Sequence, residues 1–447
     1  MAESQENRGA SGARPEAAGL ASRRGALEVI ERVRGGESLD DALDRSRAFS
    51  ALEGPDRGFA RALIGETLRR RGSLDHILGA YIDRPLPKRA ARIMDILRLA
   101  AAQLLLLQTP DHAAVATAVD LAQERRETEN YAKLVNAITR KVAKAGPAAL
   151  EKLPERIDAP GWMWRGWERG FGPVKARAIA EAHRRQPGLD LTLRDPRDAP
   201  GRAERLGAEL LLGASLRLVN PPADIKGLDG FAEGAWWVQD AAAALPARLL
   251  CDVGGKRVFD LCAAPGGKTM QLAAAGARVA AVDISPPRLE ILKENLARTG
   301  LAAELIEADI LNWSPNEKAD AVLLDAPCTA TGTLRRHPDL AWLKTEDDLA
   351  ALSKLQARMI DHAKTFVKPG GVLLYCVCSL QPEEGERQAQ AALKRNADLS
   401  RLPITAEEAA RLPEGAVTRD GDLRTLPSML ADKGGMDGFF AARFVVG

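Results

Sequence analysis

The 447-residue sequence predicts a multidomain protein in which an all-α helical bundle precedes a small α+β connecting domain and an α/β domain with a doubly wound parallel sheet. Three observations predict this organisation. Residues 20–148 show helical periodicity, residues 149–245 change in composition, and residues 246–447 alternate strands with helices. Residues 1–19 are rich in Gly, Ala, Ser and Glu and are predicted to form a flexible tail.

The composition is that of an ordinary globular protein, with 46% hydrophobic and 28% charged residues and a net charge of +2. These values exclude a largely disordered chain and a global polycation, so binding to a nucleic acid would depend on local patches. Five scattered Cys and five His predict neither a disulfide framework nor a metal site. No apolar run reaches the ~20 residues that a membrane span needs, and the N-terminus lacks the apolar region of a secretory signal. We therefore expect a cytoplasmic protein.

Apolar side chains recur at helical spacing through residues 20–148, as at Leu27, Ile30 and Val33. Turn signals that contain Gly or Pro divide this segment into about six or seven helices. Basic residues gather in the stretch Arg69–Arg92. On charge alone this stretch is either a solvated helix face or a contact surface for RNA.

The segment 149–245 is rich in Pro and Gly and begins with a cluster of three Trp residues. Short β-like pieces follow at Leu189–Leu193 and Leu216–Val219, so the segment is predicted to form a small α+β connecting domain. For the Trp cluster, a place in the core is favoured over a base-stacking platform. The cluster comprises Trp162, Trp164 and Trp167.

From Lys256 onward, strand-like apolar runs alternate with helical ones. Helices are expected to begin near Thr269, Pro287 and Asp347, and the second of them ends at Gly300. Because strands that are separated by helices run parallel, the predicted sheet is parallel and doubly wound. The predicted strands are RVFDLCA, ARVAAVDIS, AELIEAD, ADAVLLDAP, GGVLLYCVCS and FFAARFVV.

A glycine-containing segment joins the first strand to the first helix, which is where ligands bind in open α/β sheets. Gly266 and Gly267 would let backbone approach a ligand, and the absence of GxxxxGK[ST] and GxGxxG disfavours a P-loop and an NAD site. Asp283 ends the next strand and suits two ribose hydroxyls, and Asp309, expected at the end of the third strand, suits an adenine amino group. The alternative is that both acids cap helices. The AAPGGKT form of the segment indicates S-adenosylmethionine.

Two cysteines follow strand ends in the same predicted sheet. Cys328 follows the fourth strand and Cys378 the fifth, so both thiols are expected to meet over one pocket. Cys251 and Cys262 are interpreted as small buried hydrophobes. Methylation at C5 of cytosine needs a thiolate that adds to C6, an acidic group near N3 and a second group that resolves the adduct. Cys378, Asp325 and Cys328 can fill these roles in that order.

Methylation of an exocyclic amine is the alternative chemistry. It is associated with a strand-end Asp-Pro-Pro-aromatic motif, in which the aromatic ring stacks on the base. The segment here is Asp325-Ala326-Pro327-Cys328, which has no aromatic residue, so C5 methylation is favoured.

Three segments together resemble the RNA cytosine-C5 methyltransferase family, known as the Nol1/Nop2/Sun or Fmu group: CAAPGGKT, LLDAPCTATGTLRRHPDLAW and CSLQPEE. The helical region is similar to the antitermination factor NusB through GETLRRRGSLDHIL, LRLAAAQLLL, PDHAAVATAVDLA and LVNAITRK. Together the two likenesses cover nearly the whole chain past residue 20. They imply a NusB-like helical RNA-binding domain and a Rossmann-like, S-adenosylmethionine-dependent methyltransferase domain. The favoured substrate that they imply is RNA, and among RNAs 16S rRNA.

The resemblance also implies roles for individual residues. Cys378 matches the nucleophile of the family's Thr-Cys-Ser motif, and Cys328 matches the Pro-Cys cysteine that assists product release. Val377 replaces the usual Thr and Cys376 adds a third thiol, but the continuation SLQPEE keeps the register and favours Cys378. The residues that match the family's cofactor contacts are Cys262, Ala263, Ala264, Pro265, Gly266, Gly267, Lys268, Asp283, Asp309 and Asp325.

Arg335, Arg336 and His337 follow the Pro-Cys motif and are candidate RNA contacts. The target cytosine is expected to leave its stack to reach the pocket. The alternatives are a non-catalytic RNA-binding factor, which rests on the helical region alone, and a C5 methyltransferase for another RNA such as tRNA. A DNA cytosine methyltransferase, with Cys328 as the nucleophile, is disfavoured by the NusB-like region and by CSLQPEE. We expect a monomer.

Overall fold

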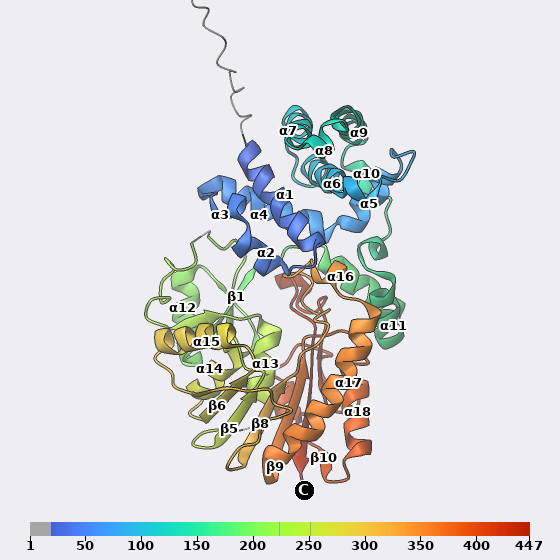
Figure 1. Ribbon diagram of the computed structural model, residues 1–447. Coiled ribbons are helices and arrows are strands. Elements are labelled where there is room, and N and C mark those ends of the chain that lie inside the picture. The colour runs from blue at the N-terminus through green and yellow to red at the C-terminus, as the bar shows by residue number, and fades with distance from the viewer. Residues whose placement is uncertain (1–18, 223, 251) are drawn as a thin grey trace, which may run out of the picture. The chain divides into compact units, whose positions relative to one another are not determined.

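The computed structural model describes residues 19–222, 224–250 and 252–447 (Figure 1). The chain forms two compact units, and the division between them falls after Leu153. The predicted tail up to residue 18, and Cys251, lie outside the described residues. Within the described ranges, no helix is long and apolar enough to cross a membrane, and no group of three or more His, Cys, Asp or Glu side chains could hold a metal ion.

The first unit is a bundle of α-helices, as its periodicity predicts (Figure 1). Most residues of α6 (Ala91–Leu105) are buried, and α1, α4, α5, α7 and α9 pack against it. The other long helices are α1 (Leu20–Arg34), α4 (Gly54–Arg69), α5 (Arg71–Gly79), α7 (Asp111–Gln123) and α9 (Ala132–Ala145). The short ones are α2 (Leu39–Arg45), α3 (Arg47–Ser50), α8 (Arg126–Glu129) and α10 (Ala148–Glu151).

The second unit begins with an α+β portion. Its helix α11 (Gly161–His183) is kinked at Gly172, where φ is 79°, and carries the three Trp residues. Trp167 is fully buried, which fits the favoured core role, whereas Trp162 and Trp164 are half-buried. An antiparallel sheet follows, in the order β2-β3-β1-β4. Its elements are β1 (Leu189–Leu193), α12 (Ala199–Leu206), β2 (Glu209–Leu210), β3 (Ser215–Leu218) and β4 (Trp236–Val238).

The large sheet of the second unit has eight strands within the described residues, in the order β10-β12-β9-β8-β5-β6-β7, with β11 paired to β12. Strands β5 to β9 run parallel, as predicted, but β12 is antiparallel to β9. The prediction of a wholly parallel sheet is wrong at this edge, because β12 follows β11 without an α-helix between them and pairs with it antiparallel. The strands are β5 (Arg257–Leu261), β6 (Arg278–Asp283), β7 (Glu304–Glu307), β8 (Ala319–Asp325), β9 (Val367–Val377), β10 (Leu399–Arg401), β11 (Leu423–Thr425) and β12 (Phe439–Val446).

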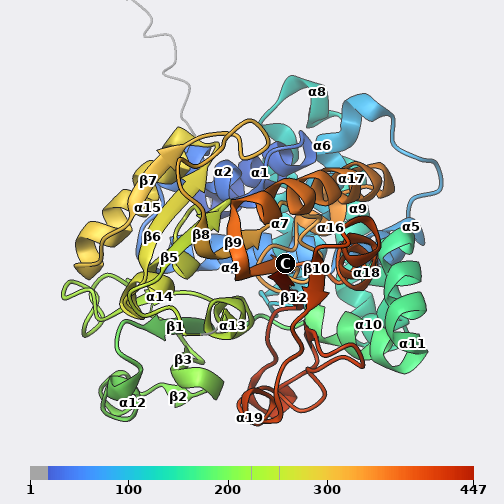
Figure 2. The ribbon, with the colours of Figure 1, turned by 90° about the horizontal axis from the view of Figure 1, so that it is seen from below.

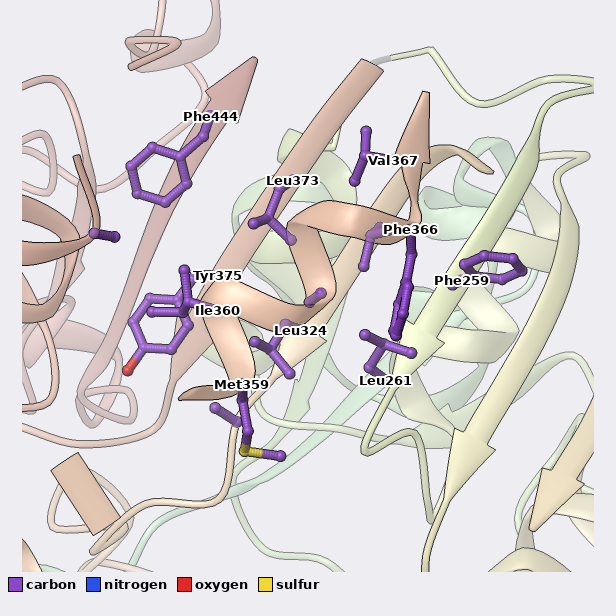
Figure 3. Close-up of a cluster of buried hydrophobic side chains, with 14 of the residues drawn as sticks. Phe259, Leu261, Leu324, Met359, Ile360, Phe366, Val367, Leu373, Tyr375 and Phe444 are labelled. Atoms are coloured by element: carbon purple, nitrogen blue, oxygen red, sulfur yellow. The ribbon is translucent and has the colours of Figure 1, made fainter. Parts of the chain in front are cut away.

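Helices cover both faces of this sheet (Figures 1 and 2). Side chains alternate along each strand, so Phe259 and Leu261 belong to the core under α17, while Val258 belongs to the core under α13. Figure 3 shows the first of these cores, where Met359 and Phe366 lie beside strand residues. The helices are α13 (Ala241–Leu249), α14 (Gly267–Ala274), α15 (Pro286–Thr299), α16 (Leu340–Leu343), α17 (Glu346–Ala363), α18 (Glu386–Arg395) and α19 (Ala406–Ala409).

The predicted boundary between residues 245 and 246 lies inside α13. Leu245 and Leu249 of this helix share a core cluster with Val258 and Leu374 of the large sheet. The connecting portion and the large sheet therefore belong to one compact unit, and a cut at residue 246 would divide that core.

Candidate active site

The loop after β5 allows a close approach of backbone to a ligand. Cys262 has a left-handed φ of 61°, and the Ala264–Pro265 peptide is cis. Gly266 has a φ of 103°, and a Cβ there would lie 1.9 Å from a side-chain carbon of Leu292. The positive φ favours glycine at this position. The loop lies at the carboxyl end of β5, where ligands bind in open α/β sheets.

Asp283 ends β6 beside this loop, as predicted. Its Oδ2 accepts a hydrogen bond from the Ala264 N–H at 3.0 Å, and its Oδ1 accepts one from the Ser285 N–H at 3.0 Å. Each carboxylate oxygen keeps a second acceptor position. Asp283 therefore shapes the loop and the turn that precedes α15, and it retains the capacity to accept ribose hydroxyls.

Asp309 does not end a strand, which corrects the predicted position. β7 ends at Glu307, and Asp309 lies in the turn that follows. Its Oδ1 accepts from the Leu311 N–H at 3.0 Å and its Oδ2 from Nδ2 of Asn312 at 2.7 Å. The Ala308 N–H donates to the Asp283 carbonyl, so the turn still lies at the end of β6.

Ile284 was not singled out from the sequence. It directly follows Asp283, and 68% of it is exposed. The signal in the sequence is its position directly after the strand-end acid Asp283, at the edge of the sheet where ligands bind. Its exposure, which is unusual for a branched apolar residue, is visible only in the structure.

Lys268 joins the cofactor loop to the end of β8. Its Nζ donates to Oδ2 of Asp325 at 2.8 Å, and its side chain is almost fully buried. Burial lowers the pKa of Lys268, but Asp325 and the nearby Cys376 sulfur outweigh burial and raise the pKa above its ordinary value. Burial raises the pKa of Asp260 to about 7, although Oγ1 of Thr269 donates to this carboxylate. Lys268 therefore stays charged and holds Asp325 in place.

Cys328 and Cys378 meet, as predicted from the parallel strands. Their Sγ atoms lie 3.5 Å apart, and both side chains are half-buried. The hydrogen bond between the two sulfurs, together with burial, raises the pKa of Cys328 well above its ordinary value. The pair thus combines close contact with partial access to solvent, as a nucleophile and its assisting group require.

Cys376 differs from this pair in its burial, although strand periodicity alone places it on the same face as Cys378. β9 ends at Val377, so Cys378 lies in the loop beyond the strand. Cys376 stays within the sheet, fully buried, and its Sγ lies 3.6 Å from Oδ1 of Asp325. Burial and then Asp325 raise the pKa of Cys376 well above its ordinary value, which makes it a poor nucleophile.

Glu384, the last residue of the segment CSLQPEE, ties the two cysteine loops together. It is fully buried; its Oε1 accepts from the Thr329 N–H at 2.9 Å and from Nε2 of Gln356 at 3.0 Å, and Oγ1 of Thr329 donates to its Oε2. The same Gln356 nitrogen donates to the Pro327 carbonyl at 2.9 Å. Burial raises the pKa of Glu384, although every one of these contacts is with a donor.

The three candidate RNA contacts lie in different environments. Arg335 is only 1% exposed and donates to the Gly434 carbonyl at 2.5 Å, so the prediction of an RNA contact is wrong for its side chain. Arg336 remains 36% exposed, and its Nε and Nη2 both donate to Oδ2 of Asp437 at 2.8 and 2.5 Å. His337 is half-buried beside it, with Nε2 at 3.4 Å from Nη1 of Arg336.

The basic stretch Arg69–Arg92 contains both buried and exposed basic side chains. Arg69 is buried against Glu66 at 2.6 Å, and Arg92 is buried against Glu31 at 2.8 Å, so both are internal ion pairs of the bundle. The exposed basic residues of the stretch are Arg84, Lys88 and Arg89. Charge patterning could not separate the two groups, because tertiary packing decides which arginines meet an acid.

Comparison with known proteins assigns two parts of the chain to families. The model of the family described as 16S rRNA methyltransferase RsmB/F matches residues 247–445, and the NusB family model matches residues 20–144. The chain is 32% identical to the ribosomal RNA small subunit methyltransferase B of Shewanella oneidensis, over 94% of this chain and 96% of that protein. The namesake from Pseudomonas putida is 33% identical, over 95% and 98%. The crystal structure of PH0851 shares the fold, with a TM-score of 0.76 at 23% identity over 95% of this chain and 98% of that one.

Proposed function

The chain belongs to the 16S rRNA methyltransferase RsmB/F family, with an N-terminal NusB domain and S-adenosylmethionine as its cofactor, and from this premise we propose that it methylates C5 of a cytosine in 16S rRNA through a covalent bond between Cys378 and C6. The observation that carries the proposal is the 3.5 Å contact between the sulfurs of Cys378 and Cys328 at the edge of the sheet that also holds Asp325. Methylation of an amine has no use for such a pair.

Each residue has a distinct role in this proposal. The Cys378 thiolate adds to C6, and N3 takes up a proton that Asp325, positioned by Lys268, donates in its acid form, so that the ring can accept the electron pair. C5 then becomes nucleophilic and takes up the electrophilic methyl group that S-adenosylmethionine supplies when bound. A base removes the C5 proton, the Cys378 sulfur leaves C6 as a thiolate, and N3 returns its proton to Asp325, which restores the ring. Cys328 assists this last step.

Two variants of the full chain test the assignment on labelled 16S rRNA. Cys378→Ser should abolish methylation and give no covalent RNA adduct, because a hydroxyl is not ionised at neutral pH. Cys328→Ala should still attack and transfer the methyl group but stall, giving a slow protein–RNA band on a denaturing gel. Cys376→Ala is the matched control, because its thiol is buried in the sheet.

The opposite pattern, with an adduct in Cys378→Ser and none in Cys328→Ala, would refute the assignment and favour Cys328 as the nucleophile. An adduct in both variants would point to Cys376. Methylation of tRNA but not of 16S rRNA by the wild-type protein would refute the proposed substrate while leaving the chemistry intact.

A further inference from the structure

The loop that carries Cys378 is short and connects a strand to a helix. β9 ends at Val377 and α18 begins at Glu386, so the connection comprises residues 378–385, which we call the nucleophile loop. Both ends of this loop lie beside one arginine that belongs to another strand. That residue is Arg424 of β11, and only 5% of it is exposed.

The guanidinium of Arg424 bonds to both ends of the nucleophile loop. At the start, its Nη1 donates to the Ser379 carbonyl at 2.6 Å. At the end, its Nε donates to Oε1 of Glu386 at 2.9 Å, and its Nη2 donates to Oε2 at 2.8 Å. Burial raises the pKa of Glu386, but the charge of Arg424 outweighs burial and lowers this pKa, so Glu386 stays ionised. Charge-assisted hydrogen bonds from a planar fork fix direction as well as distance.

The register of the sheet places Arg424 level with the end of β9. Arg424 pairs with Phe440 of β12, and Phe440 pairs with Val377, the residue before Cys378. The guanidinium also lies near two aromatic rings, at 5.0 Å from the centroid of Phe440 and 5.6 Å from that of Phe171 in α11. Backbone pairing and packing against these rings therefore determine where the guanidinium lies.

The carbonyls of Cys378 and Ser379 each accept a hydrogen bond from a different segment. The Cys378 carbonyl accepts from the Gly332 N–H at 2.9 Å, and the Ser379 carbonyl accepts from Arg424. Because each bond orients one planar peptide group, the two bonds together orient the backbone that follows the nucleophile. We therefore expect the 3.5 Å contact between the sulfurs of Cys378 and Cys328 to depend on this backbone.

We propose that Arg424 is a positioning residue that holds the two ends of the nucleophile loop together and so keeps Cys378 in place for attack on C6. The inference rests on the proposed function for the role of Cys378, and it assigns no chemical step to Arg424. Lys cannot replace Arg424 in this role, because a single ammonium group lacks the fork that bonds to a carboxylate and a carbonyl at once. Misplacement of a reacting group by about 1 Å can slow the chemical step about 100-fold.

Arg424→Lys in the full-length protein tests this role. Its kcat for methylation of 16S rRNA should fall at least about tenfold, while KM for the RNA should stay within about twofold of the wild-type value. Hydrogen exchange is followed by mass spectrometry with no RNA or cofactor present. Exchange of the amides in the nucleophile loop should become at least about tenfold faster, because the loop opens more often when its ends are not joined.

Arg443→Lys is the matched control, because Arg443 is also a buried arginine of the large sheet. Its Nη1 and Nη2 donate to the two carboxylate oxygens of Glu408 at 2.7 and 2.8 Å. They also donate to the carbonyls of Leu249 and Pro403 at 2.8 and 2.9 Å. These partners lie outside both cysteine loops. Thermal unfolding should show similar losses of stability in the two variants, but Arg443→Lys should keep the wild-type kcat and the wild-type exchange of the nucleophile loop.

A wild-type kcat in Arg424→Lys, or an equal loss of kcat in both variants, would overturn the proposal. If Arg424→Lys does not fold, Glu386→Gln replaces it, because this variant keeps the shape and the bond to Ser379. Its kcat should fall about threefold, since a neutral acceptor bonds more weakly, and an unchanged kcat would overturn the proposal. A wild-type protein that methylates no cytosine would refute the proposed function. In that case, loop exchange that is faster in Arg424→Lys alone would still support the positioning role, and equal exchange in the two variants would overturn it.

Discussion

The loop after β5 and the two loops that carry the cysteines meet at one edge of the sheet but are held in different ways. In the first loop, side chains bond to backbone atoms: Asp283 accepts from the Ala264 N–H, Arg288 donates to the Ala264 carbonyl, and Asn295 donates to the Pro265 carbonyl. The cysteine loops are held by buried side chains that also bond to one another, above all Glu384, Thr329 and Ser379. Two sulfurs at 3.5 Å need such fixed side chains.

The largest expected effect is at Gly266. Gly266→Ala should weaken binding of S-adenosylmethionine by at least about 100-fold, or about 3 kcal/mol, because the new Cβ would meet Leu292 and strain the backbone. Isothermal calorimetry measures this. Gly370→Ala is the matched control, since it has a similar φ of 75° but open space around it. Equal affinities for the two variants would show that backbone shape does not govern this loop.

Asp283→Ala should have the next largest effect. Removing an acceptor of hydrogen bonds that involve a charged group costs about 1.5–3 kcal/mol, so affinity for S-adenosylmethionine should fall roughly tenfold to a hundredfold. The same titration checks this result, and Asp309→Ala, in the turn beyond β7, should lose less. Unchanged affinity in Asp283→Ala would count against its assignment to the ribose.

A third variant, with a smaller expected effect, tests whether the cysteine loops can be disturbed without disturbing the loop after β5. In α11, a Cβ at Gly166 would lie 1.8 Å from the Gln381 side chain, which belongs to the loop after β9. Gly166→Ala should therefore lower kcat for methylation by about tenfold through displacement of Cys378 while leaving S-adenosylmethionine affinity intact. Gly161→Ala, which meets only the flexible end of Arg165 in the same helix, is the control. Loss of cofactor affinity in Gly166→Ala would show that the loops are not independent.

The smallest expected effect on the binding of a ligand lies outside both loops, in the helical unit. Lys88→Gln, at an exposed position of the helical unit, should weaken RNA binding about two- to threefold and reduce the salt slope by about one. Filter binding over a salt series measures both. Arg92→Gln should instead lower the free energy of unfolding by about 3–5 kcal/mol, because it breaks a buried ion pair. If Lys88→Gln bound RNA as the wild type does, the helical unit would have to contact RNA elsewhere.

Local patterns in the sequence predicted the structure correctly where a single element or a single motif determines it. Helical spacing predicted the bundle, and strand–helix alternation predicted the strands that bring Asp283, Cys328 and Cys378 to one edge. The prediction was wrong at the last strand, whose direction depends on the connection through β10 and β11. It was also wrong for Arg335, because burial is a property of the packed chain.

The sequence by itself determined the domain types, the family, the cofactor loop and the pair of cysteines, because these depend on periodicity and on residues adjacent in the chain. Only the tertiary structure decided which buried side chains hold the cysteine loops. The Thr329 N–H donates to Glu384 across 55 residues of sequence, and Arg336 donates to Asp437 across 101. Hydrogen bonds depend on distance in space, so separation along the chain could not reveal these pairs.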